Sequence, residues 1–261
     1  MSNRPELSRS GETQAVVLVK ALPQAGGVYG ETVCVAAIDE YGRWLRLYPV
    51  TFRQLEHAKQ FGRWDRIRFG WRLPETSKDR RAESRRVNPD SIEITGKLRD
   101  SEKGRFLSRA IVDSTKKEYS EGRSLALVRP DEPKFYWKKK SASEIEKVRR
   151  DYERLESSND LFGGRRVVPR EPAPFDFYYS YRDADGAHEA RCHDWEIEAT
   201  FMKRRTELGE QAALEWMASK FNEEYPRKGM VLAMGTHSQR NWQWMIIGVV
   251  RLDPILQTTL F

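Results

Sequence analysis

Short strand-like segments, each bounded by turn residues, dominate the first hundred positions of this 261-residue chain. Some are continuous apolar runs typical of buried strands, and others alternate apolar with polar residues, as strands with one buried face do. A short helix is predicted at residues 52–61. The predicted strands lie at residues 15–20, 32–38, 43–48, 65–72 and 91–94. Five short strands with one small helix in fewer than ninety residues predict a small closed or partly open β-barrel.

The rest of the chain mixes helices with strands. A capping box at Ser141 to Glu144 predicts the start of a helix. Further helices are predicted near residues 194–206 and 209–224. The apolar segments 230–234 and 242–252 are separated by a polar turn, so we expect them to pair as a hairpin.

These patterns divide the chain into five parts. We expect a disordered arm, a first barrel-like unit, a helical connector, a second α+β unit and a C-terminal tail. Their boundaries are residues 1–13, 14–100, 101–123, 124–253 and 254–261.

The charge balance favours an anionic partner. Lys and Arg number 46 against 39 Asp and Glu, which leaves a net charge of +7. A positive field attracts polyanions, of which nucleic acid is the commonest. The sequence has no Walker A loop, no G-x-G-x-x-G and no G-x-S-x-G, so it offers no support for a nucleotide-loop enzyme or a serine hydrolase.

The compartment is predicted from what the sequence lacks. No apolar stretch approaches the ~18 residues that a membrane-spanning helix requires. Residues 1–14 are polar and contain no apolar core of a secretory signal. Cys34 and Cys192 are far apart and form no disulfide framework, which fits a reducing compartment. We therefore expect a cytoplasmic protein with no membrane partner and no cofactor.

The alternating strands carry the clearest binding signal. Trp44, Arg46 and Tyr48 share one face of their strand, opposite Leu45 and Leu47. The next strand places its arginines, among them Arg66 and Arg68, on the face opposite its apolar residues. Guanidinium groups beside aromatic rings suit phosphates and stacked bases of single-stranded nucleic acid. The alternative is that the rings pack into the barrel and the arginines only solvate its outside.

Three basic clusters lie outside these strands. The first, residues 78–86, contains Arg80 and Arg81, and the second, residues 134–140, interleaves aromatic residues such as Trp137 with lysines such as Lys138. The third is Arg165-Arg166, which follows two glycines that allow a backbone to approach a phosphate. Each cluster alone is typical of a solvated surface, but together they predict an electrostatic footprint for nucleic acid.

The stretch from Cys192 to Glu198 is the densest candidate for catalysis. His193, Asp194 and Glu196 lie in it and could support a metal-dependent nuclease. Alternatively, Cys192, His193 and His237 could ligate zinc, although no spacing here is diagnostic of either metal site. The simpler interpretation is a helix N-terminus that Asp194 caps. We favour that interpretation and assign no catalytic residue and no metal.

The sequence also resembles a known family. The residues that carry the resemblance are Thr32 to Ala36, Gly42 to Arg53, Asp79-Arg80, Glu83-Ser84 and Ser124 to Val128. They are similar to the dual OB-fold domain of bacterial proteins associated with defence and other conflict systems. The chain has Ala82 before Glu83, where the family pattern has proline.

The resemblance covers about residues 14–130 and implies two OB-like barrels that sense or bind nucleic acid. The predicted fold class is therefore α+β, mainly β, with two OB-like small β-barrels and inserted helices. The predicted function is nucleic-acid recognition or sensing in phage defence, with DNA and RNA both open as ligands. Two alternatives stay open: a metal-dependent nuclease that uses residues 192–198, and a protein-interaction adaptor.

The C-terminus carries a further partner hypothesis. Gln257, Leu260 and Phe261 form a Gln-x-x-Leu-Phe ending, which resembles the peptide by which bacterial replication and repair proteins dock on the sliding clamp. A terminal tail is free to reach a partner, and two apolar anchors suit a pocket. The alternative is that Leu260 and Phe261 fold back onto the protein itself.

Overall fold

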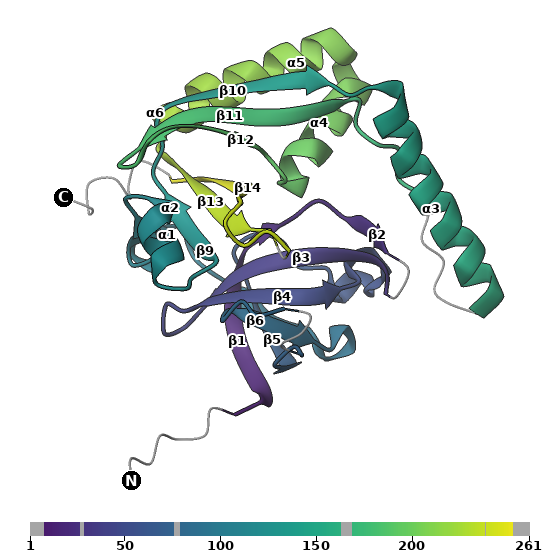
Figure 1. Ribbon diagram of the computed structural model, residues 1–261, viewed down its shortest axis with the longest axis vertical. Coiled ribbons are helices and arrows are strands. Elements are labelled where there is room, and N and C mark those ends of the chain that lie inside the picture. The colour runs from purple at the N-terminus through teal and green to yellow at the C-terminus, as the bar shows by residue number, and fades with distance from the viewer. Residues whose placement is uncertain (1–7, 27–28, 76–78, 163–168, 238, 253–261) are drawn as a thin grey trace.

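The first half of the protein is a closed five-stranded barrel (Figure 1). Its strands are β1 (Ser10–Lys20), β3 (Gly30–Asp39), β4 (Trp44–Val50), β5 (Asp65–Arg72) and β6 (Ser84–Val87). They pair around the ring in the order β1-β3-β4-β6-β5-β1, and only the β4–β6 pair is parallel. This order makes an OB-type Greek-key barrel. The computed structural model describes residues 8–26, 29–75, 79–162, 169–237 and 239–252.

The barrel interior follows the alternation of the sequence. Val35, Leu47, Ile67 and Phe69 point inward and are fully buried, as period-two side chains on one face of a strand must be. Two short strands lie outside the ring: β2 (Gln24–Gly26) pairs with β3, and β7 (Glu93–Lys97) pairs with β5. Three short 3-10 turns complete this half, at Phe52–Gln54, His57–Lys59 and Pro89–Ser91.

Three sequence predictions for this half require correction. The fifth strand of the ring is β6 and not the segment near residues 91–94, which contributes to β7 outside the ring. The predicted helix at 52–61 is two 3-10 turns. Residues 10–13 of the expected arm are strand, because they pair with Phe69 to Arg72 of β5.

The connector is only partly helical. It contains α1 (Asp100–Ser108), the two-residue strand β8 (Ile111–Val112) and α2 (Thr115–Ser120). Strand β8 pairs in parallel with β9 (Leu125–Val128) and so joins the connector to a sheet of the second half. The connector therefore contains the expected helical structure and, in addition, a short edge strand formed by two apolar residues between the helices.

The second half contains two sheets covered by helices. One sheet has the order β14-β13-β9-β8 and the other β10-β11-β12, and a bridge between Cys192 and Ile246 joins them. The new strands are β10 (Asp131–Lys139), β11 (Phe175–Asp183), β12 (Gly186–Arg191), β13 (Met230–Thr236) and β14 (Trp244–Arg251). The mainly β, α+β class is confirmed, and the predicted hairpin is β13–β14.

Helices of the second half lie over the β10–β11 layer (Figure 1). They are α4 (Trp195–Leu208), α5 (Glu210–Ser219), a π-helical turn (Lys220–Glu224) and α6 (Tyr225–Arg227). Aromatic packing holds this layer: Phe135 stacks on Phe177 with ring centroids 5.5 Å apart, and Phe177 meets Phe201 edge-on. The remaining helix, α3 (Ala142–Phe162), starts at the predicted capping box, where Glu144 Oε2 accepts from the Ser141 amide at 2.8 Å.

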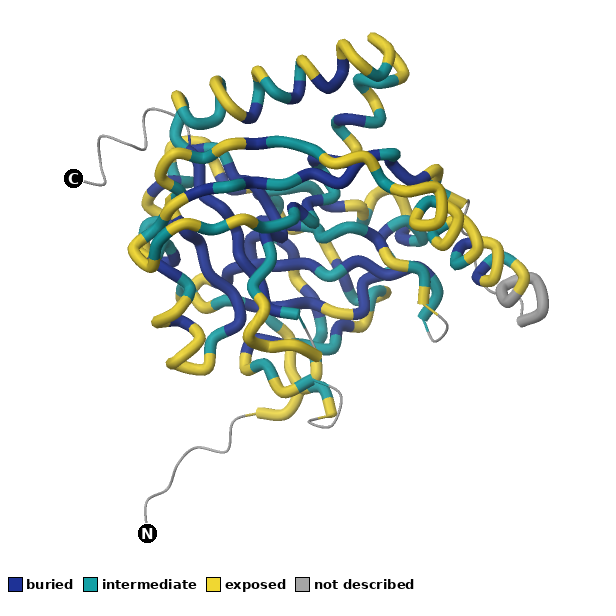
Figure 2. Tube along the Cα trace, turned by 45° about the horizontal axis from the view of Figure 1, so that its top comes forward, coloured by how far each residue is buried: buried dark blue, intermediate teal, exposed yellow. Residues whose placement is uncertain are grey.

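A shared core joins the two halves. Val16, Leu18 and Ile38 on the outside of the barrel pack with Leu127 and Val231 of the second half, and all five are buried. The tube view shows this buried layer running through the middle of the molecule (Figure 2). Part of the outer barrel surface is therefore interior to the whole protein. Among the described residues, no helix is long and apolar enough to cross a membrane.

Candidate nucleic-acid interface

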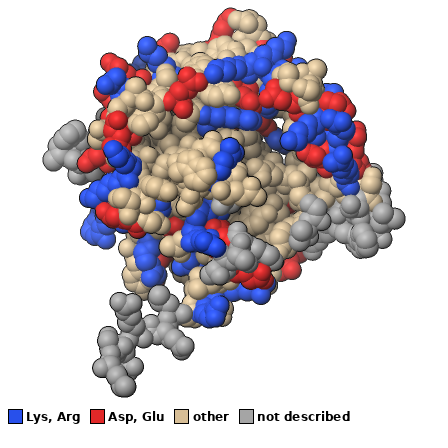
Figure 3. All heavy atoms as spheres, viewed as in Figure 1, with Lys and Arg blue, Asp and Glu red and all other residues tan. Residues whose placement is uncertain are grey.

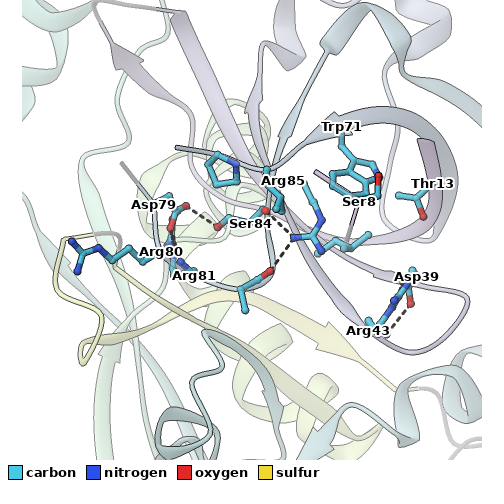
Figure 4. Close-up of a pocket in the computed structure, with 14 residues that line it drawn as sticks. Ser8, Thr13, Asp39, Arg43, Trp71, Asp79, Arg80, Arg81, Ser84 and Arg85 are labelled. Carbon is cyan, nitrogen blue, oxygen red and sulfur yellow. Dashed lines mark hydrogen bonds and ion pairs between the residues drawn. The ribbon is translucent and has the colours of Figure 1, made fainter. Parts of the chain in front are cut away.

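A hollow of about 420 Å³ lies at one edge of the barrel, and we call it the barrel-edge pocket (Figure 4). It forms where the β3–β4 turn, the end of β5 and the start of β6 meet the first residues of β1. Its volume falls within the range of ligand-binding clefts. The charged and aromatic side chains that line it are Asp39, Arg43, Trp71, Asp79, Arg80, Arg81 and Arg85.

The β3–β4 turn is ordered by a buried carboxylate. Asp39 Oδ1 accepts from the amides of Tyr41 and Arg43 at 3.0 and 2.8 Å, and Gly42 adopts a φ of +78° that favours glycine. The Arg43 Nε donates to Asp39 Oδ2 at 2.8 Å, yet the Arg43 side chain stays 68% exposed. The turn therefore holds a guanidinium group at the rim of the pocket. Its tip residue, Tyr41, is 69% exposed and has the Arg43 guanidinium 4.9 Å from its ring centroid.

A second carboxylate orders the segment that leads into β6. Asp79 accepts from Arg81 Nε and Arg81 Nη2, both at 2.8 Å, and from Ser84 Oγ at 2.7 Å. Burial opposes ionisation of Asp79, but the hydrogen bonds from Arg81 and Ser84 outweigh it and lower the pKa of this carboxyl. Arg81 Nη1 also donates to the Thr236 carbonyl at 2.9 Å, which ties the segment to β13. Arg81 therefore holds the segment before β6 against β13 at the edge of the pocket.

Trp71 and Arg85 line the pocket and lie against each other. The Arg85 guanidinium lies 4.8 Å from the Trp71 ring centroid, and its Nη1 donates to the carbonyls of Ala82 and Ser84, both at 2.9 Å. A Cβ at Gly11 would lie 3.6 Å from Trp71 Cζ2, so the backbone of β1 approaches the ring closely. Trp71 therefore packs against Arg85 and helps to position its guanidinium group.

Arg85 lines the pocket as a cation that a ligand can reach. Among the described residues, no carboxylate forms an ion pair with it, whereas Arg43 and Arg81 are paired with Asp39 and Asp79. Burial, and then repulsion from Arg43, lower the pKa of Arg85. An anion placed between Arg43 and Arg85 would relieve that repulsion. The geometry suits a phosphate on the two guanidinium groups and a base on Tyr41.

The first predicted group, Trp44, Arg46 and Tyr48, does not form one exposed face. Trp44 packs against the shared core, and only Tyr48, at 46% exposed, is open to solvent. Arg46 is buried, and its Nη2 donates to the Ser124 carbonyl at 2.9 Å. The prediction that Arg46 contacts phosphate does not fit this position, because the second half covers the face on which it lies.

Arg66 and Arg68 lie on the outside of β5, as the alternation predicts. Arg68 is exposed and pairs with Glu93 (Nη2–Oε2 2.5 Å) and with Glu12 (Nε–Oε1 3.6 Å), so carboxylates already meet its charge. Arg66 lines a second hollow, beside α1. The two arginines therefore have different surroundings although they share a strand face.

The predicted basic clusters lie in separate places. Arg80 lines the barrel-edge pocket with Arg81 and points away from Trp71 and Arg85 (Figure 4). Trp137 packs against the core of the second half, while Lys138 is exposed, pairs with Glu189 at 3.0 Å and lies over the Tyr178 ring. Arg165, Arg166 and the tail residues Gln257, Leu260 and Phe261 lie outside the described residues. Clamp docking by the tail therefore stays a prediction.

The Cys192–Glu198 stretch has the form of a helix N-terminus. Asp194 is the N-cap of α4: its Oδ1 accepts from the Glu196 amide at 2.8 Å and its Oδ2 from the Val249 amide at 2.8 Å. Arg63 Nη2 pairs with both Asp194 and Glu196, at 3.1 and 2.9 Å. Burial lowers the pKa of His193 to about 4. In the part of the chain that the structure describes, no three His, Cys, Asp or Glu side chains are grouped to hold a metal.

The sequence predictions missed Tyr41, Arg43, Trp71 and Arg85 as site residues. Trp71 follows the inward alternation of Ile67 and Phe69, so it reads as core. Arg85 lies in a run of charged residues that reads as a loop, and only its placement in β6 brings it over Trp71. The signal that could have found the turn is Asp39 followed by Gly42, a spacing typical of an ordered hairpin turn.

Comparisons with known proteins identify two adjacent family matches. A model described as Domain of unknown function (DUF8758) matches residues 11–113, and one described as Domain of unknown function (DUF8757) matches residues 107–261. No curated protein matches the sequence of the chain.

Two solved structures show weak similarity. The crystal structure of the tetrameric p202 HIN2 has a TM-score of 0.31 and 11% identity over 73% of this chain and 75% of that chain. A Replication Protein A heterotrimer bound to ssDNA has a TM-score of 0.25 and 12% identity over 95% of this chain and 67% of that chain. Similarity at this level says nothing about function, which is inferred from the geometry of the site alone.

Proposed function

Because the chain belongs to the family described as Domain of unknown function (DUF8757), which assigns no activity, we propose from its geometry that it binds single-stranded nucleic acid at the barrel-edge pocket. The observation that carries the proposal is Arg85, whose guanidinium lies 4.8 Å from the Trp71 ring centroid without a carboxylate partner among the described residues, and which lines the pocket together with the exposed Arg43. The proposed activity is recognition and involves no catalytic step.

The roles of the residues follow from their contacts. Arg85 and Arg43 bind one phosphate, since both line the pocket and an anion between them would relieve their mutual repulsion. Tyr41 stacks on a base, because its ring is exposed at the tip of a turn that Asp39 makes rigid. Asp79 and Arg81 act as positioning residues that fix the start of β6.

Single strands suit this pocket better than a duplex does. A base in a duplex is stacked and paired, so its face is unavailable to Tyr41 unless the helix opens. An exposed ring on a narrow turn needs an unstacked base. DNA and RNA both present the phosphate and the base that this geometry uses, so both are expected to bind.

The proposal is tested by fluorescence anisotropy with labelled single-stranded DNA, single-stranded RNA and duplex DNA of one length, at several salt concentrations. We expect single strands to bind more tightly than the duplex and affinity to fall as salt rises, since bound phosphates release counterions. An unlabelled mononucleotide as competitor distinguishes a strand-binding protein from a nucleotide-binding one. Binding of the mononucleotide with the affinity of the strand would contradict the proposal.

Variants locate the site. Tyr41→Ala should weaken single-strand binding by roughly 5- to 150-fold, which corresponds to the ~1–3 kcal/mol of one stacked base, and Tyr41→Phe should retain it. Arg43→Gln with Arg85→Gln should weaken binding and reduce the salt dependence. The matched control removes two exposed charges on α3, by Lys147→Gln with Arg150→Gln. Equal affinity of the arginine double variant and this control would sink the proposal.

A further inference from the structure

A second hollow, of about 410 Å³, lies beside α1 and shares the β3–β4 turn with the barrel-edge pocket. We call it the α1 pocket. The turn contributes Asp39 and Arg43 to the barrel-edge pocket, and Glu40 and Gly42 to the α1 pocket. Tyr41, the exposed tip of this turn, therefore lies in sequence between residues that line the two hollows.

Three arginines line the α1 pocket. They are Arg66 from β5 and Arg105 and Arg109 from α1 and its C-terminal end. Within the described residues, none of the three side chains has a hydrogen bond or an ion pair. Arg105 and Arg109 are also exposed. Lys and Arg side chains gather at the left margin of the space-filling view, where Figure 1 draws α1 (Figure 3).

The acidic groups of the α1 pocket do not neutralise these arginines. Glu102 is already paired with Arg99, whose Nε lies 3.5 Å from Glu102 Oε2. Glu40 is exposed at the turn and carries the other negative charge. Phe106 lines the pocket and is half-buried against the shared core, so it offers apolar surface beside the cations. This combination suits an anionic ligand with flat apolar groups.

We propose that the α1 pocket is a second phosphate-binding site, and that one nucleic-acid strand crosses the β3–β4 turn at Tyr41 to occupy both pockets. The inference rests on the proposed function of the barrel-edge pocket and adds a second site with its own residues. The strand places one phosphate on Arg43 and Arg85, a base on Tyr41, and further phosphates on Arg66, Arg105 and Arg109. Strand length therefore sets affinity: a strand too short to cross the turn occupies the barrel-edge pocket only.

The experiment compares labelled oligothymidylates of about four and about sixteen nucleotides, which bracket the lengths that single OB folds cover. The test variant is Arg105→Gln with Arg109→Gln, and the control is Lys147→Gln with Arg150→Gln on α3, which lies on the opposite side of the molecule (Figure 1). For the long strand, we expect the test variant to lose about 10-fold in affinity and its salt slope to fall by about 1.4, for two lost phosphate contacts. The short strand should bind to both variants as it binds to the natural sequence.

A variant of opposite sign separates the inference from a general loss of fold. Glu40→Gln removes a negative charge from the α1 pocket, so it should tighten binding of the long strand several-fold and leave the short strand unchanged. The second site would be overturned if Arg105→Gln with Arg109→Gln left long-strand affinity unchanged while Arg43→Gln with Arg85→Gln lost binding. The proposed function would then stay intact. Equal losses for both strand lengths, or for the control, would also overturn the second site. If neither strand binds to the natural sequence, the proposed function fails and the inference fails with it.

Discussion

Arg46 shows how one buried cation can join two parts of a chain. Its Nη2 donates to the carbonyl of Ser124, and the Ser124 amide and hydroxyl donate to Glu83 at 2.7 and 2.8 Å. Burial lowers the pKa of Arg46, so the position is costly for a charge. The hydrogen bonds through Ser124 connect it to a carboxylate and offset that cost. The residue is therefore a connector between β4 and β9.

His193 supplies a test at the scale of one side chain. Burial, together with the charges of Arg191 and His237, lowers the pKa of His193 to about 4 from its ordinary 6.5. The folded protein therefore keeps His193 neutral at pH values where the unfolded chain binds a proton. The contribution of neutral His193 to the free energy of unfolding is fully present above pH 6.5. It is lost as pH falls through the folded pKa, and the free energy of unfolding then drops by at most about 1.4 kcal/mol per pH unit.

We expect His193→Gln to flatten the loss of stability between pH 7 and pH 5, as measured by urea denaturation at both pH values. His57→Gln is the matched control, because His57 is exposed. Nucleic-acid affinity should be unchanged in His193→Gln, since His193 does not line the barrel-edge pocket. An identical pH slope in His193→Gln and the natural sequence would contradict this account of His193.

At this scale the sequence predicts faces but not what covers them. Alternation correctly placed Arg46 opposite Leu45 and Leu47. It could not show that Ser124, 78 positions later, would lie against that face. Asp194 was predictable as a helix cap because capping is local, and the structure has that cap.

Among the elements, local patterns were the most predictable. The capping box of α3 and the β13–β14 hairpin both follow from residues close in sequence. Strand β6 was missed because it has four residues, two of them arginine, and because its parallel partner β4 is distant in the chain. Short polar strands depend on their neighbours in the sheet, so propensity alone does not reveal them.

The approach of β14 to β1 gives a prediction at the scale of the element. Gly248 in β14 lies against Val19 in β1, so closely that an added Cβ would be 2.3 Å from Val19 Cγ2. Gly248→Ala should therefore destabilise the protein by roughly 1–3 kcal/mol through overpacking. Chemical denaturation of the variant and of the natural sequence measures the difference.

The control removes the side chain that Gly248→Ala would meet. Val19→Ala together with Gly248→Ala should be more stable than Gly248→Ala with Val19 intact, because the clash is with the Val19 methyl groups. If Gly248→Ala is as stable as the natural sequence, then β14 does not approach β1 at Val19 as closely as the structure has it.

For the whole molecule, the packing of the two halves decides where a ligand can bind. An OB barrel commonly binds oligonucleotides on its second and third strands and on the loops beside them. Here those strands are β3 and β4, and Ala36, Ile38 and Trp44 on their outer face are packed in the shared core. The loop between the fourth and fifth strands stays accessible and contributes Asp79, Arg80 and Arg81 to the barrel-edge pocket. The second half thus shifts the available surface from the sheet face to the barrel edge.

The shared core also predicts how the molecule unfolds. The two family models divide the chain near residues 107–113, yet the core that contains Leu18 and Val231 crosses that division. Separating the halves would expose this core to water, at a cost of about 25 cal/mol for each Å² of apolar surface. The Arg63–Asp194 ion pair, which also joins the halves, would be broken as well. We therefore expect the two halves to unfold together.

Calorimetry of the full chain should show one transition, with a calorimetric enthalpy equal to the van't Hoff enthalpy, as for a two-state protein. Leu127→Ala, which leaves a cavity in the shared core, should lower the midpoint of that single transition by an amount corresponding to roughly 2–5 kcal/mol, and should not split it in two. A fragment of residues 1–113 should fail to give a cooperative transition because Val16, Leu18 and Ile38 would be uncovered. Two resolved transitions in the full chain, or cooperative folding of that fragment, would show instead that the barrel is an independent domain.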